Sequence, residues 1–404
     1  MPTPAFARLA PVSYAANAVD QLAIATVPLA LTAGGASAST VSVVVAAQSA
    51  AWLLVSLPAG ALADRIPRRR LMQAGAIAAI AGALVAAAGS LSATPSALLL
   101  AIGVFVAAAG VVTQILCVFA LMPGVVASAQ LGRANAQLEL ARSLATIAAP
   151  LIAAFCIARG LGPVPFLLAF LAACLGLGAV SRLSADVPAP SARQPMLAAI
   201  GDGARFVLHE PILRAIALCA CAWNPAFICL VSMFAPFAAH TLGFSIEEIG
   251  WAWAAYGTGA LLAAFVAPAA MAHIPTGVLF VGGPLGSLAG SLVIVAGGQR
   301  WGLPAVLAGF FLTGFTPMVW LVLQTSVRQL LTPTEYLGRV AATITTAIYG
   351  IRPLGALAAG AAAYWWSPVA AMWLSVALFA LSALAIIVSP AVGLKSMPVP
   401  RRSA

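Results

Sequence analysis

Ionisable side chains are rare in the long apolar segments of this chain, and each one that occurs there is a candidate for chemistry. Asp20 lies about seven residues, or about 10 Å, into the first of these segments. An ionised group in such a segment costs at least about 2.5 kcal/mol on insertion scales, so it needs a partner or a purpose. A buried carboxyl group can bind and release a proton in the physiological range. We therefore expect Asp20 to exchange protons, the alternative being a fixed ion pair or a carboxylate at a helix end.

Two arginines in apolar segments raise the same question. Arg142 follows Glu139 by three residues, so the two side chains share a helix face. They either neutralise each other, or Glu139 is the second candidate for proton exchange. Arg352 lies about fifteen residues into its segment, with no acidic residue within one helical turn. It either pairs with a carboxylate of another helix, Asp20 or Glu139, or presents its guanidinium to an anionic ligand.

Polar and aromatic side chains in the same segments complete a candidate binding surface. Asn17, Asp20 and Gln21 fall on one helix face, which predicts a polar stripe that faces a cavity. The residues expected to contact a ligand are Asn17, Gln21, Gln114, Arg142, Asn224, Tyr256, Gln324, Tyr349 and Arg352. Core packing explains each single side chain of this set equally well. Five tryptophans, Trp251, Trp253, Trp301, Trp365 and Trp366, lie near segment ends and are interpreted as membrane-interface anchors.

The composition decides which solvent surrounds these segments. The chain has 404 residues, of which 63% are hydrophobic, with only 19 Lys and Arg and 9 Asp and Glu. Its mean hydropathy is +1.07. In a soluble protein about a quarter of the residues are charged, so the composition excludes a secreted enzyme, a coiled coil and a disordered scaffold. The net charge of +10 comes from arginines between apolar segments and indicates membrane topology, so we expect no nucleic-acid partner.

The apolar segments predict an all-α integral membrane protein with twelve spans of about 20 residues each. They cover about 12–33, 41–63, 71–92, 97–122, 134–158, 163–183, 212–240, 246–270, 275–297, 303–327, 336–363 and 366–389. Alternate connections carry the arginines, including Arg65, Arg68 and Arg69, while the others are nearly free of charge. Positive loops stay in the cytoplasm, so both termini are expected there.

A long polar interval divides the twelve spans into two sets of six. We expect an N-terminal six-helix bundle at 1–184, a cytoplasmic linker at 185–211, a C-terminal bundle at 212–390 and a cytoplasmic tail at 391–404. The second part of the linker, MLAAIGDGARFVLHE, has apolar residues at helical spacing and is expected to lie along the membrane surface. The same triplet, Leu-Gly-Arg, opens the fifth and the eleventh spans, which favours a duplicated unit with a cavity between its halves.

The connection after the second span reads GALADRIPRRRLM at 60–72 and resembles the loop motif of the major facilitator superfamily. The matching positions are Gly60, Leu62, Asp64, Arg65, Arg68 and Arg69, and Pro67 replaces the usual glycine. The resemblance implies that Gly60, Asp64, Arg65, Arg68 and Arg69 form a gate whose contacts change as two helical bundles rock. The alternative is a positive loop that only sets topology.

Further segments resemble one bacterial branch of this superfamily, that of the enterobactin exporter and its macrolide-efflux relatives. They are 17–31, 131–150, 201–216, 243–264 and 337–363. The resemblance implies a monomeric secondary transporter in the bacterial cytoplasmic membrane that exports a small amphipathic molecule, such as a siderophore or drug, by proton antiport and alternating access. Its partners would be this small molecule, protons and membrane lipid. The fifth span departs from the drug/proton antiporter pattern because it keeps Pro150 but has alanines in place of glycines.

Several alternatives to export remain open. An uptake permease has the same architecture, since fold alone does not fix the direction of transport. A channel or lipid translocase is a third possibility. The sequence contains no HExxH, GxSxG or phosphate-binding loop and no Cys/His cluster, so we expect neither an enzyme nor a cofactor or metal site.

Overall fold

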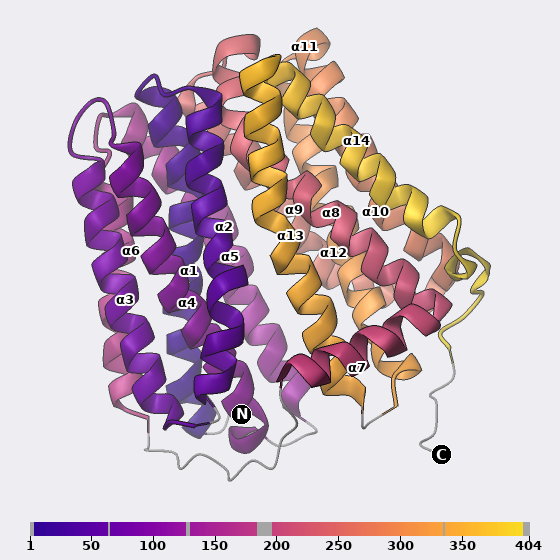
Figure 1. Ribbon diagram of the computed structural model, residues 1–404. Coiled ribbons are helices and arrows are strands. Elements are labelled where there is room, and N and C mark those ends of the chain that lie inside the picture. Colours follow the sequence, from indigo (N-terminus) through magenta and orange to yellow (C-terminus); the bar gives the residue numbers. More distant parts are fainter. Residues whose placement is uncertain (1–3, 64, 127–129, 184–195, 334–335, 399–404) are drawn as a thin grey trace. The chain divides into compact units, whose positions relative to one another are not determined.

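The computed structural model describes residues 4–63, 65–126, 130–183, 196–333 and 336–398. In these ranges every regular element is a helix, and twelve spans are long and apolar enough to cross a membrane (Figure 1). The predicted all-α fold with twelve spans is therefore confirmed, and the protein crosses its membrane many times.

Contacts within the chain divide it into two compact units. The first consists of Met1–Ala192 and Ser245–Gly250, and the second of Arg193–Phe244 and Trp251–Ala404. The helices of the first unit are α1 (Pro4–Ala33), α2 (Ala38–Ala63), α3 (Arg68–Gly89), α4 (Ala97–Val125), α5 (Leu131–Ala158) and α6 (Val164–Ser181). Those that follow are α7 (Met196–His209), α8 (Pro211–Phe237), η2 (Ala238–Leu242), α9 (Ile246–His273), α10 (Thr276–Leu292), η3 (Val293–Gly297), α11 (Gly298–Trp301), α12 (Leu303–Leu331), α13 (Leu337–Trp365), α14 (Pro368–Ile387) and η5 (Pro390–Gly393).

The first and the ninth spans extend beyond their predicted bounds. The first helix begins at Pro4 rather than near residue 12, because Phe6 and Leu9 are only 3% and 2% exposed and join the core of the first unit. The ninth span continues past residue 297 to Trp301 through the π-helical turn η3.

Glycines bring the third and fourth spans of each half into close contact. A Cβ atom on Gly82 of α3 would lie 2.3 Å from the backbone nitrogen of Ala107 in α4. Likewise, a Cβ atom on Gly290 of α10 would lie 2.6 Å from the carbonyl oxygen of Gly309 in α12. Small residues let membrane helices approach closely where no side chain intervenes. Close glycine contacts at equivalent places in both halves accord with a duplicated unit.

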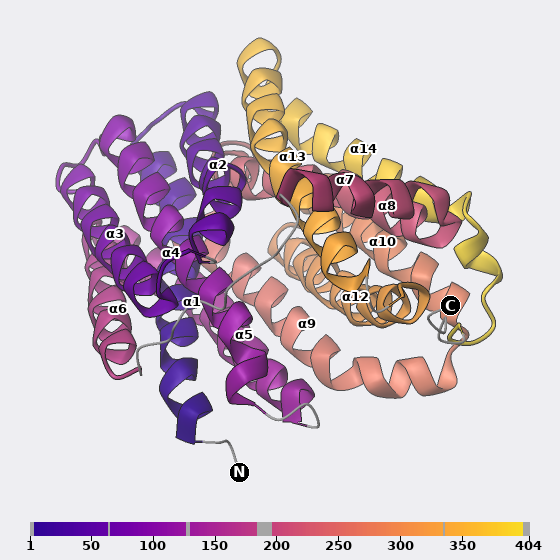
Figure 2. The ribbon, with the colours of Figure 1, turned by 60° about the horizontal axis from the view of Figure 1, so that its bottom comes forward.

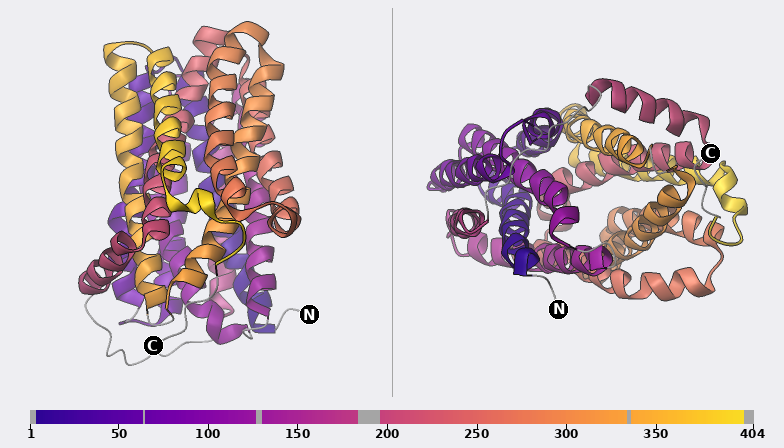
Figure 3. Two further views of the ribbon diagram at one scale, coloured as in Figure 1. Left: turned by 90° about the vertical axis from the view of Figure 1, so that its right-hand side faces the viewer. Right: turned by 90° about the horizontal axis from the view of Figure 1, so that it is seen from below.

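The helix predicted in the second part of the linker is α7. It packs on α13, at the end that is predicted to face the cytoplasm (Figure 2). The rings of Phe206 and Tyr336 stack with centroids 5.1 Å apart, and Arg339 Nη1 lies 3.5 Å from Asp202 Oδ2. A Cβ atom on Gly203 would lie 2.4 Å from the Arg339 carbonyl oxygen, so only glycine permits this approach. Figure 3 shows α7, in dark magenta, lying across the direction of the long helices of its unit.

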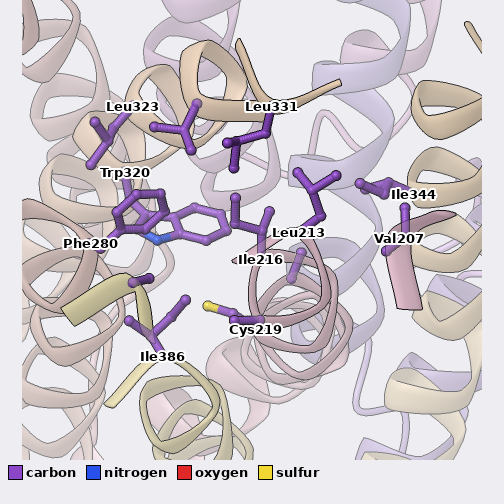
Figure 4. Close-up of a cluster of buried hydrophobic side chains, with 14 of the residues drawn as sticks. Val207, Leu213, Ile216, Cys219, Phe280, Trp320, Leu323, Leu331, Ile344 and Ile386 are labelled. Atoms are coloured by element: carbon purple, nitrogen blue, oxygen red, sulfur yellow. The ribbon is translucent and has the colours of Figure 1, made fainter. Parts of the chain in front are cut away.

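The second unit has a core cluster that joins most of its helices (Figure 4). Ile216 and Cys219 of α8 meet Phe280 of α10, Trp320 of α12 and Ile386 of α14. Trp320 is 8% exposed, so this aromatic side chain belongs to the core.

Candidate functional site

Arg352 is held against α8 by a neutral side chain. Its Nε atom donates a hydrogen bond of 2.8 Å to Asn224 Oδ1, and its guanidinium lies 4.7 Å from the ring centroid of Tyr349. The amide nitrogen of Asn224 donates to the Ala220 carbonyl oxygen at 2.9 Å, which turns the amide oxygen toward the arginine. Close packing of α13 on α8 brings the groups together, since a Cβ atom on Gly355 would lie 2.5 Å from the Cα atom of Pro225.

The positive charge of Arg352 has no counterion among the described residues of its own unit. Among the described residues of the second unit, no carboxylate lies within 4.0 Å of it, and no group accepts from its four other N–H bonds. Asp202 of this unit is paired with Arg339. The side chain is half-buried. Asp20 and Glu139, the two carboxylates predicted as its partners, belong to the first unit.

A row of aromatic rings continues from Asn224 along α8 and α9. Phe227, one turn after Asn224, stacks on Trp223 at 5.0 Å and packs against Tyr256 at 5.3 Å. The indole nitrogen of Trp223 donates to Ser287 Oγ at 3.0 Å, which fixes its ring. Trp253 packs edge-on against Tyr256 at 5.9 Å. Trp253 is half-buried, so the residue predicted as an interface anchor also packs against the rings of this row.

A second polar group links α1 to α5 in the first unit. Gln21 Nε2 lies 3.4 Å from Asp20 Oδ2, and Gln21 Oε1 accepts a hydrogen bond of 3.1 Å from Thr146 Oγ1. Thr146 was absent from the predicted site, although its place one turn after Arg142 on the same face of α5 was a usable signal. Its hydroxyl also lies 2.9 Å from the Arg142 carbonyl oxygen.

Glu139 and Arg142 form an ion pair on α5. Arg142 Nε lies 3.0 Å from each carboxylate oxygen of Glu139, and Arg142 Nη2 contacts one of them. The two side chains are 37% and 40% exposed. The pair matches the interpretation in which the two charges neutralise each other.

Besides Asn224, which is 6% exposed, three of the predicted contact residues are buried. Asn17 is 8% exposed and donates to the Ser13 carbonyl oxygen at 2.8 Å. Gln114 is 2% exposed and packs beside Gly75. Gln324 is 6% exposed and donates to Thr325 Oγ1. The predicted polar stripe on α1 is thus divided, with Asn17 buried and Gln21 turned toward α5.

The loop motif is described in part, because Asp64 lies outside the described residues. Arg69 Nη2 donates to the carbonyl oxygen of Ser181 at 2.8 Å, where a cation complements the C-terminal end of α6. Pro67 precedes α3 with a φ of −53°, a value that proline prefers, so its replacement of glycine needs no change of the backbone. Gly60 lies in the last turn of α2, Arg65 is exposed, and Arg68 is the first residue of α3.

Comparison with known proteins agrees with this architecture. Residues 12–237 match the profile of the Major Facilitator Superfamily, while no curated protein sequence matches the chain. A POT family transporter solved in complex with 5-aminolevulinic acid has a TM-score of 0.76 at 11% identity, covering 96% of this chain and 97% of that chain. The nucleoside transporter NupG has a TM-score of 0.73 at 11% identity, covering 95% and 98%.

A D-xylose-proton symporter has a TM-score of 0.68 at 13% identity and covers 94% of this chain and 95% of that chain. At these identities the structural likeness establishes the fold, and the profile establishes the family. The chain belongs to the major facilitator superfamily and is a transporter with its twelve-helix fold, not an enzyme.

Proposed function

We propose that this transporter exports a small amphipathic organic molecule that carries oxygen acceptors, such as a siderophore or drug-like compound, in exchange for protons. The segments that resemble the enterobactin exporter and macrolide-efflux branch support the choice of substrate and direction. The bacterial cytoplasmic membrane, with both termini in the cytoplasm, is the location that the arginine-rich connections support.

The observation that carries the proposal is the contact of Arg352 with neutral Asn224. Asn224 orients the guanidinium without cancelling its charge, which leaves four N–H donors for a ligand. A planar guanidinium binds paired oxygen atoms through two parallel hydrogen bonds. The row of Phe227, Tyr256 and Trp223 supplies apolar surface for the rest of an amphipathic molecule.

Asp20 is the proposed proton carrier. Arginine does not release its proton at physiological pH, so the coupling group must be a carboxyl group. Glu139 is bound by Arg142, whereas Asp20 Oδ2 lies 3.4 Å from the amide nitrogen of the neutral side chain of Gln21. In the proposed cycle, the loop that contains Asp64 helps to close the cytoplasmic side, and the substrate site faces each side in turn.

Transport by the purified protein in liposomes with an imposed pH gradient tests the proposal. The substrates are a panel of catecholate and hydroxamate siderophores and of amphipathic dyes. The wild-type protein should move one class against its gradient, in the direction that corresponds to export. Asp20→Asn should still bind this class but lose the gradient-driven component, and Arg352→Ala should weaken its binding. Movement in the opposite direction with the same coupling would identify an uptake permease and refute export.

A further inference from the structure

The hydroxyl of Thr146 is placed between two acceptors but has one hydrogen. Its oxygen lies 3.1 Å from Gln21 Oε1 on α1 and 2.9 Å from the Arg142 carbonyl oxygen on α5. A hydroxyl donates one hydrogen bond and can accept others. It therefore cannot make both bonds at full strength at once, and the choice depends on which end of the Gln21 amide faces it.

The orientation of that amide depends in turn on Asp20. An ionised carboxylate only accepts hydrogen bonds, so it requires the NH2 group of Gln21, as the contact of 3.4 Å between Nε2 and Oδ2 indicates. The amide oxygen then faces Thr146, whose hydroxyl must turn to it and leave the Arg142 carbonyl. A protonated Asp20 is a donor and requires the opposite arrangement. Its O–H bonds the amide oxygen, the NH2 group bonds Thr146 Oγ1, and the hydroxyl returns to the Arg142 carbonyl.

We infer that Gln21 and Thr146 form a relay that converts protonation of Asp20 on α1 into a change of hydrogen bonding on α5. The relay rests on the proposed role of Asp20 as proton carrier and makes Thr146 a positioning residue for coupling. One proton is added to Asp20 as an O–H bond, and only hydrogen bonds change elsewhere. The end point of the relay is the carbonyl of Arg142, the residue whose side chain holds Glu139.

Few other charges are placed to operate this relay. Within the first unit, α1 packs mainly on α2, α4, α5 and α6. Between their bounds, α2 contains no titratable side chain, while α4 and α6 contain only the thiols of Cys117 and Cys174. On α5 the groups one and two turns before Thr146 are Arg142 and Glu139, which are bound to each other. A pH-dependent change at Thr146 that vanishes in Asp20→Asn therefore reports the carboxyl group of Asp20.

NMR spectra of the full-length protein with labelled threonine methyl groups test the relay without any substrate. The Thr146 methyl resonance, assigned by its loss in Thr146→Val, should move with pH in one titration step. This step should vanish in Asp20→Asn and in Gln21→Leu. Thr113 is the matched control, since its hydroxyl bonds the Ala109 carbonyl oxygen of its own helix at 2.8 Å, and its resonance should stay constant. A Thr146 step that persists in Gln21→Leu, or is absent from the wild-type protein, overturns the relay.

Transport in liposomes gives the second measurement. Thr146→Val should lower pH-gradient-driven accumulation about fivefold, the factor that corresponds to one ordinary hydrogen bond. Thr146→Ser and Thr113→Val should stay near the wild-type value, and exchange of substrate without a pH gradient should be unchanged in all three. Equal loss of driven transport and exchange in Thr146→Val overturns the relay in favour of a packing role. If the wild-type protein shows no gradient-driven transport while its Thr146 resonance titrates as expected, the proposed antiport fails and the relay stands.

Discussion

Replacing Asn224 by aspartate should cancel the charge that we assign to substrate recognition. Asn224→Asp keeps the shape of the side chain and places a carboxylate oxygen 2.8 Å from Arg352 Nε, where the amide oxygen now lies. Hydrogen bonds between charged groups contribute about 1.5–3 kcal/mol. A ligand oxygen must compete with this new pair, so its affinity should fall about 10- to 150-fold. The second carboxylate oxygen replaces the Nδ2 donor that lies 2.9 Å from the Ala220 carbonyl oxygen, so the side chain must turn slightly away from this carbonyl, which still accepts within the helix.

A second change at the same position separates charge from geometry. Asn224→Leu leaves Arg352 Nε without its acceptor but preserves the positive charge. Leaving a charged donor unsatisfied costs about 1.5–3 kcal/mol, so this variant should unfold at lower denaturant concentration than the wild-type protein. Its affinity for an anionic ligand should change less than that of Asn224→Asp. Asn224→Asp should be more stable than Asn224→Leu, because Arg352 Nε keeps an acceptor.

The assay is equilibrium binding of the transported compound to purified protein, followed by quenching of tryptophan fluorescence. Trp223 lies next to Asn224 in the chain and provides a reporter in the aromatic row. Wild-type affinity in Asn224→Asp would refute the reasoning, because a neutralised Arg352 could not then be the group that binds the ligand. Equal losses of affinity in both variants would show that the shape of the site matters and its charge does not.

Three further changes test packing and charge elsewhere in the chain. Gly82→Val should destabilise the protein by at least about 1–3 kcal/mol in unfolding experiments, since its Cβ would lie 2.3 Å from a backbone nitrogen of α4, whereas Gly178→Val, with nothing within 4 Å, should not. Gly203→Ala should increase hydrogen exchange in α7, because its Cβ would lie 2.4 Å from a carbonyl oxygen of α13. Gly201→Ala is the control, since a Cβ atom there meets nothing within 4 Å. Equal exchange in both variants would contradict the packing of α7 on α13. Glu139→Gln should lower the free energy of unfolding by less than about 1 kcal/mol, because its ion pair is partly exposed. The variant should retain gradient-driven transport. Loss of that transport would transfer the coupling role from Asp20 to Glu139.

The number of membrane spans and the superfamily could be predicted from the sequence. Hydropathy over about 20 residues and the placement of arginines are local properties, and the membrane responds to them locally. The loop motif at 60–72 indicated the superfamily for the same reason, since its residues are consecutive in the sequence. The amphipathic helix α7 was also predicted, because its periodicity is confined to one short segment.

The partners of the candidate site were decided by tertiary structure alone. Arg352 meets Asn224 across 128 residues of sequence, and Thr146 meets Gln21 across 125. A membrane helix that is apolar on every side does not reveal which face contacts protein and which contacts lipid, so its sequence pattern cannot specify such pairs. Trp253 shows the consequence, because its position near a span end suggested lipid, while packing places it among other rings. The sequence determined which polar groups enter the membrane, and helix packing determined which of them meet.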